Sequence, residues 1–197
     1  MYKYKRNSHY FADHSDLQVC SDAGFLWGDG NVRAYDKPEL QVTLAPKDIR
    51  FLERMKNRIG YEGPIPLRTR GKYSLNVLSV YDKKIINDLK FFGVVPNKTY
   101  NPVIPNLVGE QKLAFIAGLH MADGCLTRER YPRWETCSNK PEILAWARES
   151  LCDLAPLNIE KHPTVYRIRA CGSRAKAIND LLTSLPIDYM KRKTYAR

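Results

Sequence analysis

Apolar residues along this chain follow two spacings, one typical of amphipathic helices and one typical of half-buried strands. The helical spacing is clear at Ile49, Leu52, Met55 and Ile59, which fall on one helical face. Taken in order, the first part of the chain predicts a helix over 15–28, strands over 32–36 and 40–44, a helix around 49–59, strands over 67–70 and 73–80 that turn at Gly71, and a helix over 82–92.

The same order of elements is predicted again further along the chain. A helix ends at Ala122, and a later helix begins at Pro141 and keeps apolar positions as far as Leu154. Strands are predicted over 126–131, 134–137, 158–162 and 165–170, and a last helix over 173–185. Both parts therefore read αββαββα.

Short sequence repeats support a duplication. Residues 23–30 (AGFLWGDG) recur as residues 117–124 (AGLHMADG), an offset of 94. The segments INDL at 86–89 and KTY at 98–100 recur at 178–181 and 193–195, at nearly the same offset. We therefore predict an α+β fold of two pseudo-symmetric halves, with a basic extension over 1–14, halves over 15–94 and 110–197, and a proline-rich linker over 95–109.

The repeated segment combines small residues with an acid. Gly24 and Gly28 are four residues apart, as Gly118 and Ala122 are, so each helix presents a flat stripe that favours close helix packing. Each helix then ends at an Asp-Gly pair, where a carboxylate is unfavourable because a helix C-terminus carries partial negative charge. An isolated Asp-Gly pair is also a common turn, but two in equivalent places favour a functional role.

Parallel packing of the two helices would bring Asp29 and Asp123 together. Their repulsion would raise one pKa unless a positive group lay between them. A hard divalent cation such as Mg²⁺ binds carboxylate, water, carbonyl and phosphate oxygens, and such a site can cleave phosphodiesters.

The charge of the chain favours a polyanionic partner. Lys and Arg number 32 against 21 acids, for a net charge of +11. A basic but unspecialised surface is the alternative. The five cysteines are widely spaced without a CxxC pair, which indicates buried or free thiols. No apolar run is long enough for a membrane span and no signal peptide is evident, so we expect an intracellular, cytoplasmic protein.

These features together resemble the LAGLIDADG homing endonucleases, specifically the monomeric, two-motif, archaeal intron-encoded type. The resemblance implies that Asp29 and Asp123 bind Mg²⁺ or Mn²⁺ and the scissile phosphate. It implies that the main-chain carbonyls of Gly28 and Ala122 also bind metal, and that Lys98 and Lys193 stabilise the transition state beside the cleaved phosphates.

The chain departs from the family pattern at several positions. The sixth motif position, often acidic, is Trp27 in one half and Met121 in the other, and the fifth is His120 in the second half. We expect His120 to be a packing residue. A glutamine that orders the attacking water in some members is missing at 43–45 and 136–138, so the water-ordering residues are unassigned.

The resemblance also implies that the strands of both halves form a saddle on double-stranded DNA. Cations that alternate along strands can reach base edges in the major groove, although a solvated polar face would show the same pattern. The predicted DNA-binding residues are Arg33, Tyr35, Lys37, Gln41, Arg68, Arg70, Lys72, Arg128, Arg130, Arg133, Arg167 and Arg169. The basic start of the chain, with Lys3, Lys5 and Arg6, is either a flexible arm on phosphates or disordered.

The sequence thus predicts a site-specific, metal-dependent homing endonuclease that acts as a monomer. Because the two halves differ at nearly every predicted contact, its DNA target should be asymmetric and no protein partner is needed. The alternative is a non-cleaving nucleic-acid-binding relative, such as an intron maturase or a regulator. An intein-embedded nuclease is disfavoured because splicing residues are missing from the ends of the sequence.

Overall fold

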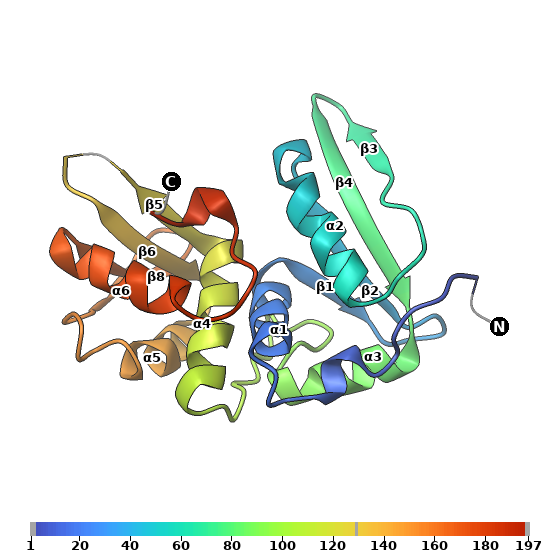
Figure 1. Cartoon of the computed structure of the whole chain (residues 1–197), viewed down its shortest axis with the longest axis horizontal. Helices are drawn as coiled ribbons and strands as arrows, with labels where there is room; N and C mark the ends of the chain where they lie inside the picture. Colours follow the sequence, from blue (N-terminus) through green and yellow to red (C-terminus); the bar gives the residue numbers. More distant parts are fainter. Residues whose placement is uncertain (1–2, 129, 196–197) are drawn as a thin grey trace.

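The computed structural model describes residues 3–128 and 130–195, with the side chain of Arg70 left undescribed, and shows two halves of one architecture (Figure 1). The first half comprises α1 (Leu17–Asp29), β1 (Gly30–Arg33), β2 (Glu39–Leu44), α2 (Ile49–Arg58), β3 (Leu67–Arg70), β4 (Tyr73–Tyr81) and α3 (Lys83–Leu89). The second comprises α4 (Gly109–Asp123), β5 (Gly124–Thr127), β6 (Arg133–Ser138), α5 (Pro141–Glu149), β7 (Ile159–Lys161), β8 (Tyr166–Cys171) and α6 (Ser173–Thr183). The predicted αββαββα order is confirmed in both halves.

Each half contains a four-stranded antiparallel sheet, ordered β1-β2-β4-β3 and β5-β6-β8-β7. Gly30 pairs with Val42 in the first sheet, and Gly124 pairs with Thr136 in the second, so the register is duplicated as well. The helices α1 and α4 lie side by side at the centre of the molecule, with one sheet on either side (Figure 1). The site at the end of these helices therefore lies between the two sheets.

The contact between α1 and α4 depends on the predicted stripe of small residues. A Cβ atom added at Gly24 would overlap the main-chain carbonyl of Phe115, and one added at Gly118 would overlap that of Ser21. These two contacts are related by the pseudo-twofold axis, since Ser21 and Phe115 are also 94 residues apart. The backbones touch because neither glycine has a side chain, and the helices run parallel, which is the arrangement that brings Asp29 and Asp123 together.

The first strand of each half starts earlier than its apolar pattern predicts. The N–H of Gly30 donates to Leu26 at the end of α1, and the same residue already pairs with β2. β1 therefore ends at Arg33, which places Tyr35 and Lys37 in a loop that turns at Asp36, with φ +38°. β5 likewise ends at Thr127, so Arg128 and Arg130 lie beyond it. For these four residues the predicted strand alternation is wrong.

The described part of the N-terminal extension is packed on the first half, so the prediction of a flexible or disordered arm is wrong. Phe11 is fully buried in the core. The N–H of Asn7 donates to the carbonyl of Ile59 at 2.8 Å, and Arg6 Nε donates to Asp82 at 2.7 Å. An apolar anchor and a buried carboxylate thus hold this segment.

The helix that starts at Pro141 ends at Glu149, short of the predicted Leu154.

Ion pairs join the C-terminal segment of the second half to the first half. Arg58 of α2 makes hydrogen bonds of 2.7 and 2.8 Å to both oxygens of the fully buried Asp22, and a third of 2.8 Å to Asp188. Arg192 binds Asp48 through two hydrogen bonds of 2.8 and 2.9 Å. The bidentate Arg192–Asp48 pair has a fixed geometry and, together with the Arg58–Asp188 pair, restricts movement between the halves.

Two further expectations concern cysteines and membranes. All five cysteines are free thiols, as predicted. Within 3–128 and 130–195, every helix is too short or too polar to cross a lipid bilayer.

We predict that Gly24→Ala destabilises the protein because the added methyl group overlaps the backbone of α4. The expected loss is about 1–3 kcal/mol or more in the free energy of unfolding, measured by urea denaturation. Gly109→Ala is the control, since its added Cβ meets open space and φ at +55° costs only about 1–2 kcal/mol. A smaller loss for Gly24→Ala than for this control would show that the helices can separate easily.

Candidate active site

Two carboxylates lie at neighbouring helix ends in the cleft between the halves. Asp29 is the last residue of α1 and Asp123 is the last residue of α4, and both are reached by solvent. Gly28 makes their approach possible, because a Cβ added there would lie 2.8 Å from Oδ2 of Asp123 and 2.5 Å from Cβ of Ala122. The acids that the sequence predicts to meet are therefore brought together.

The surroundings of both acids raise their pKa values, so they favour the neutral form more than bulk water does. Loss of hydration in the cleft raises the pKa of Asp123 to about 6, and the negative charge of Asp29 adds to this shift. The pKa of Asp29 is also raised, again mainly by loss of hydration, although Lys193, Arg192 and Lys98 act against it. The predicted repulsion acts on the pKa of Asp123, where loss of hydration has the larger effect.

Each repeated Lys-Thr-Tyr segment places a lysine beside the acids. Lys98 Nζ donates to the main-chain carbonyl of Gly30, and Lys193 Nζ donates to that of Gly124. Each ammonium group is thus fixed to the residue that follows its half's acid. Burial lowers the pKa of both lysines, while both acids act to raise it. Lys193 is buried and Lys98 is partly buried, which distinguishes them from solvated surface lysines.

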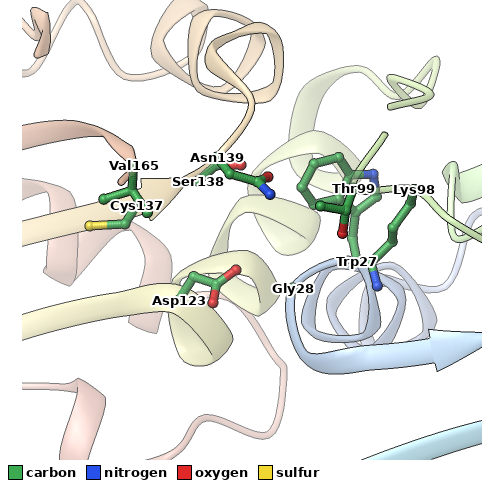
Figure 2. Close-up of a pocket in the computed structure, with 9 residues that line it drawn as sticks. All are labelled: Trp27, Gly28, Lys98, Thr99, Asp123, Cys137, Ser138, Asn139 and Val165. Carbon is green, nitrogen blue, oxygen red and sulfur yellow. The ribbon is translucent and has the colours of Figure 1, made fainter. Parts of the chain in front are cut away.

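A cavity of about 270 Å³ opens beside Asp123 (Figure 2). It is lined by residues from both halves, namely Trp27, Gly28, Lys98, Thr99, Asp123, Cys137, Ser138, Asn139 and Val165. The side chain of Asn139 points into the space between Asp123 and Lys98 (Figure 2). The sequence does not single out Asn139, because the family's water-ordering glutamine is expected within 136–138 and Asn139 is the first residue after β6.

The opposite flank has different chemistry. There the Asp48–Arg192 ion pair lies near Asp29, whose pKa Arg192 lowers and Asp48 raises. The residues equivalent to Ser138 and Asn139 at an offset of 94 are Leu44 and Ala45, which cannot orient a water through their side chains. The two ends of the pseudo-symmetric site are therefore chemically unequal.

The donor set at the acids fits a hard divalent cation. Among the described residues, no group of three or more His, Cys, Asp or Glu side chains could hold a metal ion. Mg²⁺ commonly uses only one or two protein carboxylates and completes its shell with water and phosphate. The carbonyls of Gly28 and Ala122 lie in the last turns of their helices, where intrahelical donors are missing. Two carboxylates and two such carbonyls are therefore enough protein ligands for Mg²⁺.

The departures from the family pattern have packing roles. His120 is fully buried, stacks on Trp134 at 4.8 Å between ring centroids, and lies 3.0 Å from Thr136 Oγ1 through Nδ1. Burial lowers the pKa of His120 to about 3, so the ring is neutral. Trp27 donates to the carbonyl of Val103 in the linker at 3.3 Å. His120 is therefore a packing residue, as predicted.

The predicted DNA-binding residues divide into three groups. Arg68 and Arg70 lie on β3, Arg167 and Arg169 on β8, and Gln41 and Arg133 on β2 and β6. Tyr35, Lys37, Lys72 and Arg130 are exposed in turns and loops. Arg33, at the end of β1, and Arg128, beyond β5, form the third group: Arg33 Nη1 lies 3.4 Å from Glu39, and Arg128 donates to the carbonyl of Thr194 at 2.6 Å. Arg128 therefore also holds the segment that carries Lys193. Arg167 and Arg169 also have protein partners, Glu160 and Glu135.

Comparisons with known proteins find similarity in the fold. Neither models of protein families nor curated proteins match the sequence. Among solved structures, the LAGLIDADG meganuclease I-AabMI bound to uncleaved DNA has a TM-score of 0.60 and 14% identity, over 90% of this chain and 87% of that one. I-DmoI in complex with DNA and Ca has a TM-score of 0.62 and 12% identity, over 95% and 96%. The N-terminal LAGLIDADG domain of DUF199/WhiA has a TM-score of 0.57 and 14% identity, over 92% and 90%.

These matches cover nearly the whole chain, so it has the two-half LAGLIDADG fold. The fold class expected from the sequence resemblance is confirmed.

We predict that Asp123→Asn raises the melting temperature at pH 8 and that this gain disappears at pH 4. An acid whose pKa is raised from 3.8 to about 6 on folding destabilises the folded state once it ionises, so native stability falls as pH rises through this range. Asparagine removes the charge and therefore the penalty. Melting temperatures of both proteins across pH 4–8 provide the measurement, and an equal difference at both ends would contradict the raised pKa.

Proposed function

We propose that this chain is a divalent-metal-dependent endonuclease that cuts both strands of a specific DNA duplex. One observation carries the proposal. Two acids from duplicated helix ends meet in the cleft between two sheets, and each is flanked by a lysine fixed to the next main-chain carbonyl. Structural packing alone does not account for this arrangement, because the acids lie at the negative ends of two helices and lose hydration there. Sites that oppose stability in this way are typical of function.

In the proposed reaction, the acids and helix-end carbonyls hold the metal. Asp29, Asp123 and the carbonyls of Gly28 and Ala122 are its protein ligands, with Mg²⁺ or Mn²⁺ as the ion. When bound, the metal supplies charge stabilisation at the scissile phosphate and activates a water. Lys98 and Lys193 add positive charge where negative charge develops in the transition state.

A water for attack on the phosphate requires orientation, and Asn139 and Ser138 have suitable groups for this on the Asp123 side. The amide of Asn139 can both accept and donate a hydrogen bond. The nonpolar Leu44 and Ala45 leave this role to solvent or to the Asp48–Arg192 pair on the other side. We therefore propose Asn139 as the water-positioning residue, which the sequence alone does not identify.

Double-stranded DNA is the proposed substrate. The net charge of +11 favours a polyanion, and exposed cations lie on or beside the strands of both halves. Two relatives in fold, I-AabMI and I-DmoI, were solved on DNA. Because the chain itself contains both halves and they differ at most of the proposed contacts, we propose that it acts as a monomer on an asymmetric target, as intron-encoded homing nucleases of the archaeal type do.

A DNA-binding protein that does not cut is the second candidate. The similarity to the WhiA domain favours this candidate, because that domain has the same fold and is not named as a nuclease. An intron maturase belongs to the same class. The retention of both acids and both lysines favours cleavage, because binding alone needs no carboxylate in a cleft that faces phosphates.

We expect Asp29→Asn and Asp123→Asn each to abolish double-strand cleavage in Mg²⁺ and to leave DNA affinity within about tenfold, since many cations contact phosphates. The assay uses supercoiled plasmids that carry a library of randomised segments, and affinity is measured separately by fluorescence anisotropy. Asp153→Asn, in an exposed turn after α5, is the matched control and should cut normally. Full cleavage by either site variant would refute the two-acid site.

The lysines give a separate prediction. Replacing Lys98 or Lys193 with Met should slow single-turnover cleavage by about ten- to a thousandfold, as for loss of one electrostatic stabiliser, with affinity little changed. Lys90→Met is the control, since the Lys90 side chain is exposed and its ammonium group donates to the side chain of Asn87. Rates equal to those of the unmodified protein, together with a lower melting temperature, would restrict these lysines to a structural role.

A further inference from the structure

The second sheet has an acid at the centre of its outward face. Residues of β6 alternate in burial, so that Trp134 and Thr136 face the core while Glu135 and Cys137 face outward. Cys137 also lines the cavity beside Asp123, and its Sγ lies 3.6 Å from Oε1 of Glu135. The outward face is therefore continuous with the candidate active site, and Glu135 lies on the surface proposed to contact DNA.

This carboxylate organises the arginines around it. Arg169 faces Glu135 directly across the β6–β8 ladder, and its Nε donates to Oε2 at 2.7 Å. Arg167 lies 3.7 Å from the same oxygen through Nη1, and its Nε donates to Glu160 at 2.8 Å. Only 15% of the Glu135 side chain is exposed, so the pairs are partly shielded from solvent. Burial alone would raise the pKa of Glu135, but the hydrogen bond and charge of Arg169 outweigh it and lower the pKa.

The contact geometry leaves the end of Arg169 available. Its bond to Glu135 uses Nε, so the two Nη nitrogens, which make no hydrogen bond to the part of the chain that the structure describes, remain for a base edge. A guanidinium reads guanine through two donors to O6 and N7, and this requires a fixed orientation. A carboxylate at the same place also repels phosphates, which weakens binding to DNA that offers no matching base.

The first half has no such acid at the equivalent position. Gln41 stands 94 residues before Glu135 and occupies the same place in its ladder, opposite Ser79 instead of an arginine. Its Nε2 lies 3.4 Å from Ser79 Oγ. The carboxylate is therefore a feature of one half only, and the fold accepts the neutral amide at this position.

Resting on the proposed function, we propose that Glu135 is a specificity-determining positioning residue that orients Arg169 for base recognition and weakens binding to non-matching DNA. In this role Glu135 reduces overall affinity and increases discrimination between sequences. Its effect is confined to the half of the DNA target that the second sheet covers.

Glu135→Gln tests this role because it introduces the residue found in the first half. Binding selections from a randomised duplex library, in EDTA to prevent cleavage, give the base preference at each position of the bound site. The variant should lose about fivefold or more of its preference at neighbouring base pairs in one half of the site. Its affinity for random-sequence duplex should rise about three- to tenfold near 0.1 M salt, and the dependence on salt should steepen by about one counterion.

Glu160→Gln is the matched control for charge. Glu160 lies on the edge strand β7, is hydrogen-bonded to Arg167, acts on Arg169 through its charge, and is 47% exposed. It should raise affinity for random duplex without flattening the base preference. Equal flattening by both variants would show that charge alone matters and would overturn the positioning role.

The double variant Arg169→Ala with Glu135→Gln identifies the residue through which Glu135 acts. Its preference profile should equal that of Arg169→Ala alone, and further flattening would overturn action through Arg169. A Glu135→Gln profile unchanged from that of the unmodified protein, with an unchanged melting temperature, would overturn the proposal while leaving the nuclease function intact. Failure of the unmodified protein to select any sequence would instead refute the proposed function, and this inference with it.

Discussion

The backbone contact between α1 and α4 is the constraint on which the site depends. Because Gly24 and Gly118 have no side chains, each helix lies against a carbonyl of the other, and the two run parallel. Parallel packing brings equivalent ends together, and those ends are Asp29 and Asp123. A wider or antiparallel contact would separate the acids, and neither carboxylate would then share a site with the other half. The small-residue stripe therefore links packing directly to the proposed chemistry.

The acids make this contact less stable than it could be. Loss of hydration and mutual repulsion raise the pKa of Asp123, and the helix ends add partial negative charge. The surrounding structure compensates with cations whose positions are fixed, since Lys98 and Lys193 are bonded to carbonyls and Arg192 is paired with Asp48. The C-terminal segment and the linker, which look irregular in sequence, thus complete the site.

Much of the fold and the position of the two acids could be predicted from sequence, because the duplication shows each local pattern twice. The order of elements and the two acid-bearing helix ends were predicted from repeats at nearly one offset, and the meeting of Asp29 with Asp123 was predicted for the case of parallel helices. Strand boundaries were not, because the chain enters β1 and β5 directly from a helix end, and apolar spacing does not report that geometry. Asn139 could not be identified from sequence, because it lies one residue after β6 and only the folded chain brings it to the cavity beside Asp123. The pairing of Arg167 and Arg169 with Glu135 could not be predicted from sequence, because Glu135 meets them only across the sheet.

Sequencing the ends produced from a randomised duplex library in Mg²⁺ tests the central claim most directly, because it reports cleavage and the use of both halves in one experiment. We expect cuts on both strands, closely spaced at the middle of one long site, with different base preferences on the two sides and no products when EDTA replaces Mg²⁺. Absence of cut ends despite selective binding would contradict the nuclease assignment. A palindromic site would contradict a monomer whose two unlike halves each cover one side of the DNA.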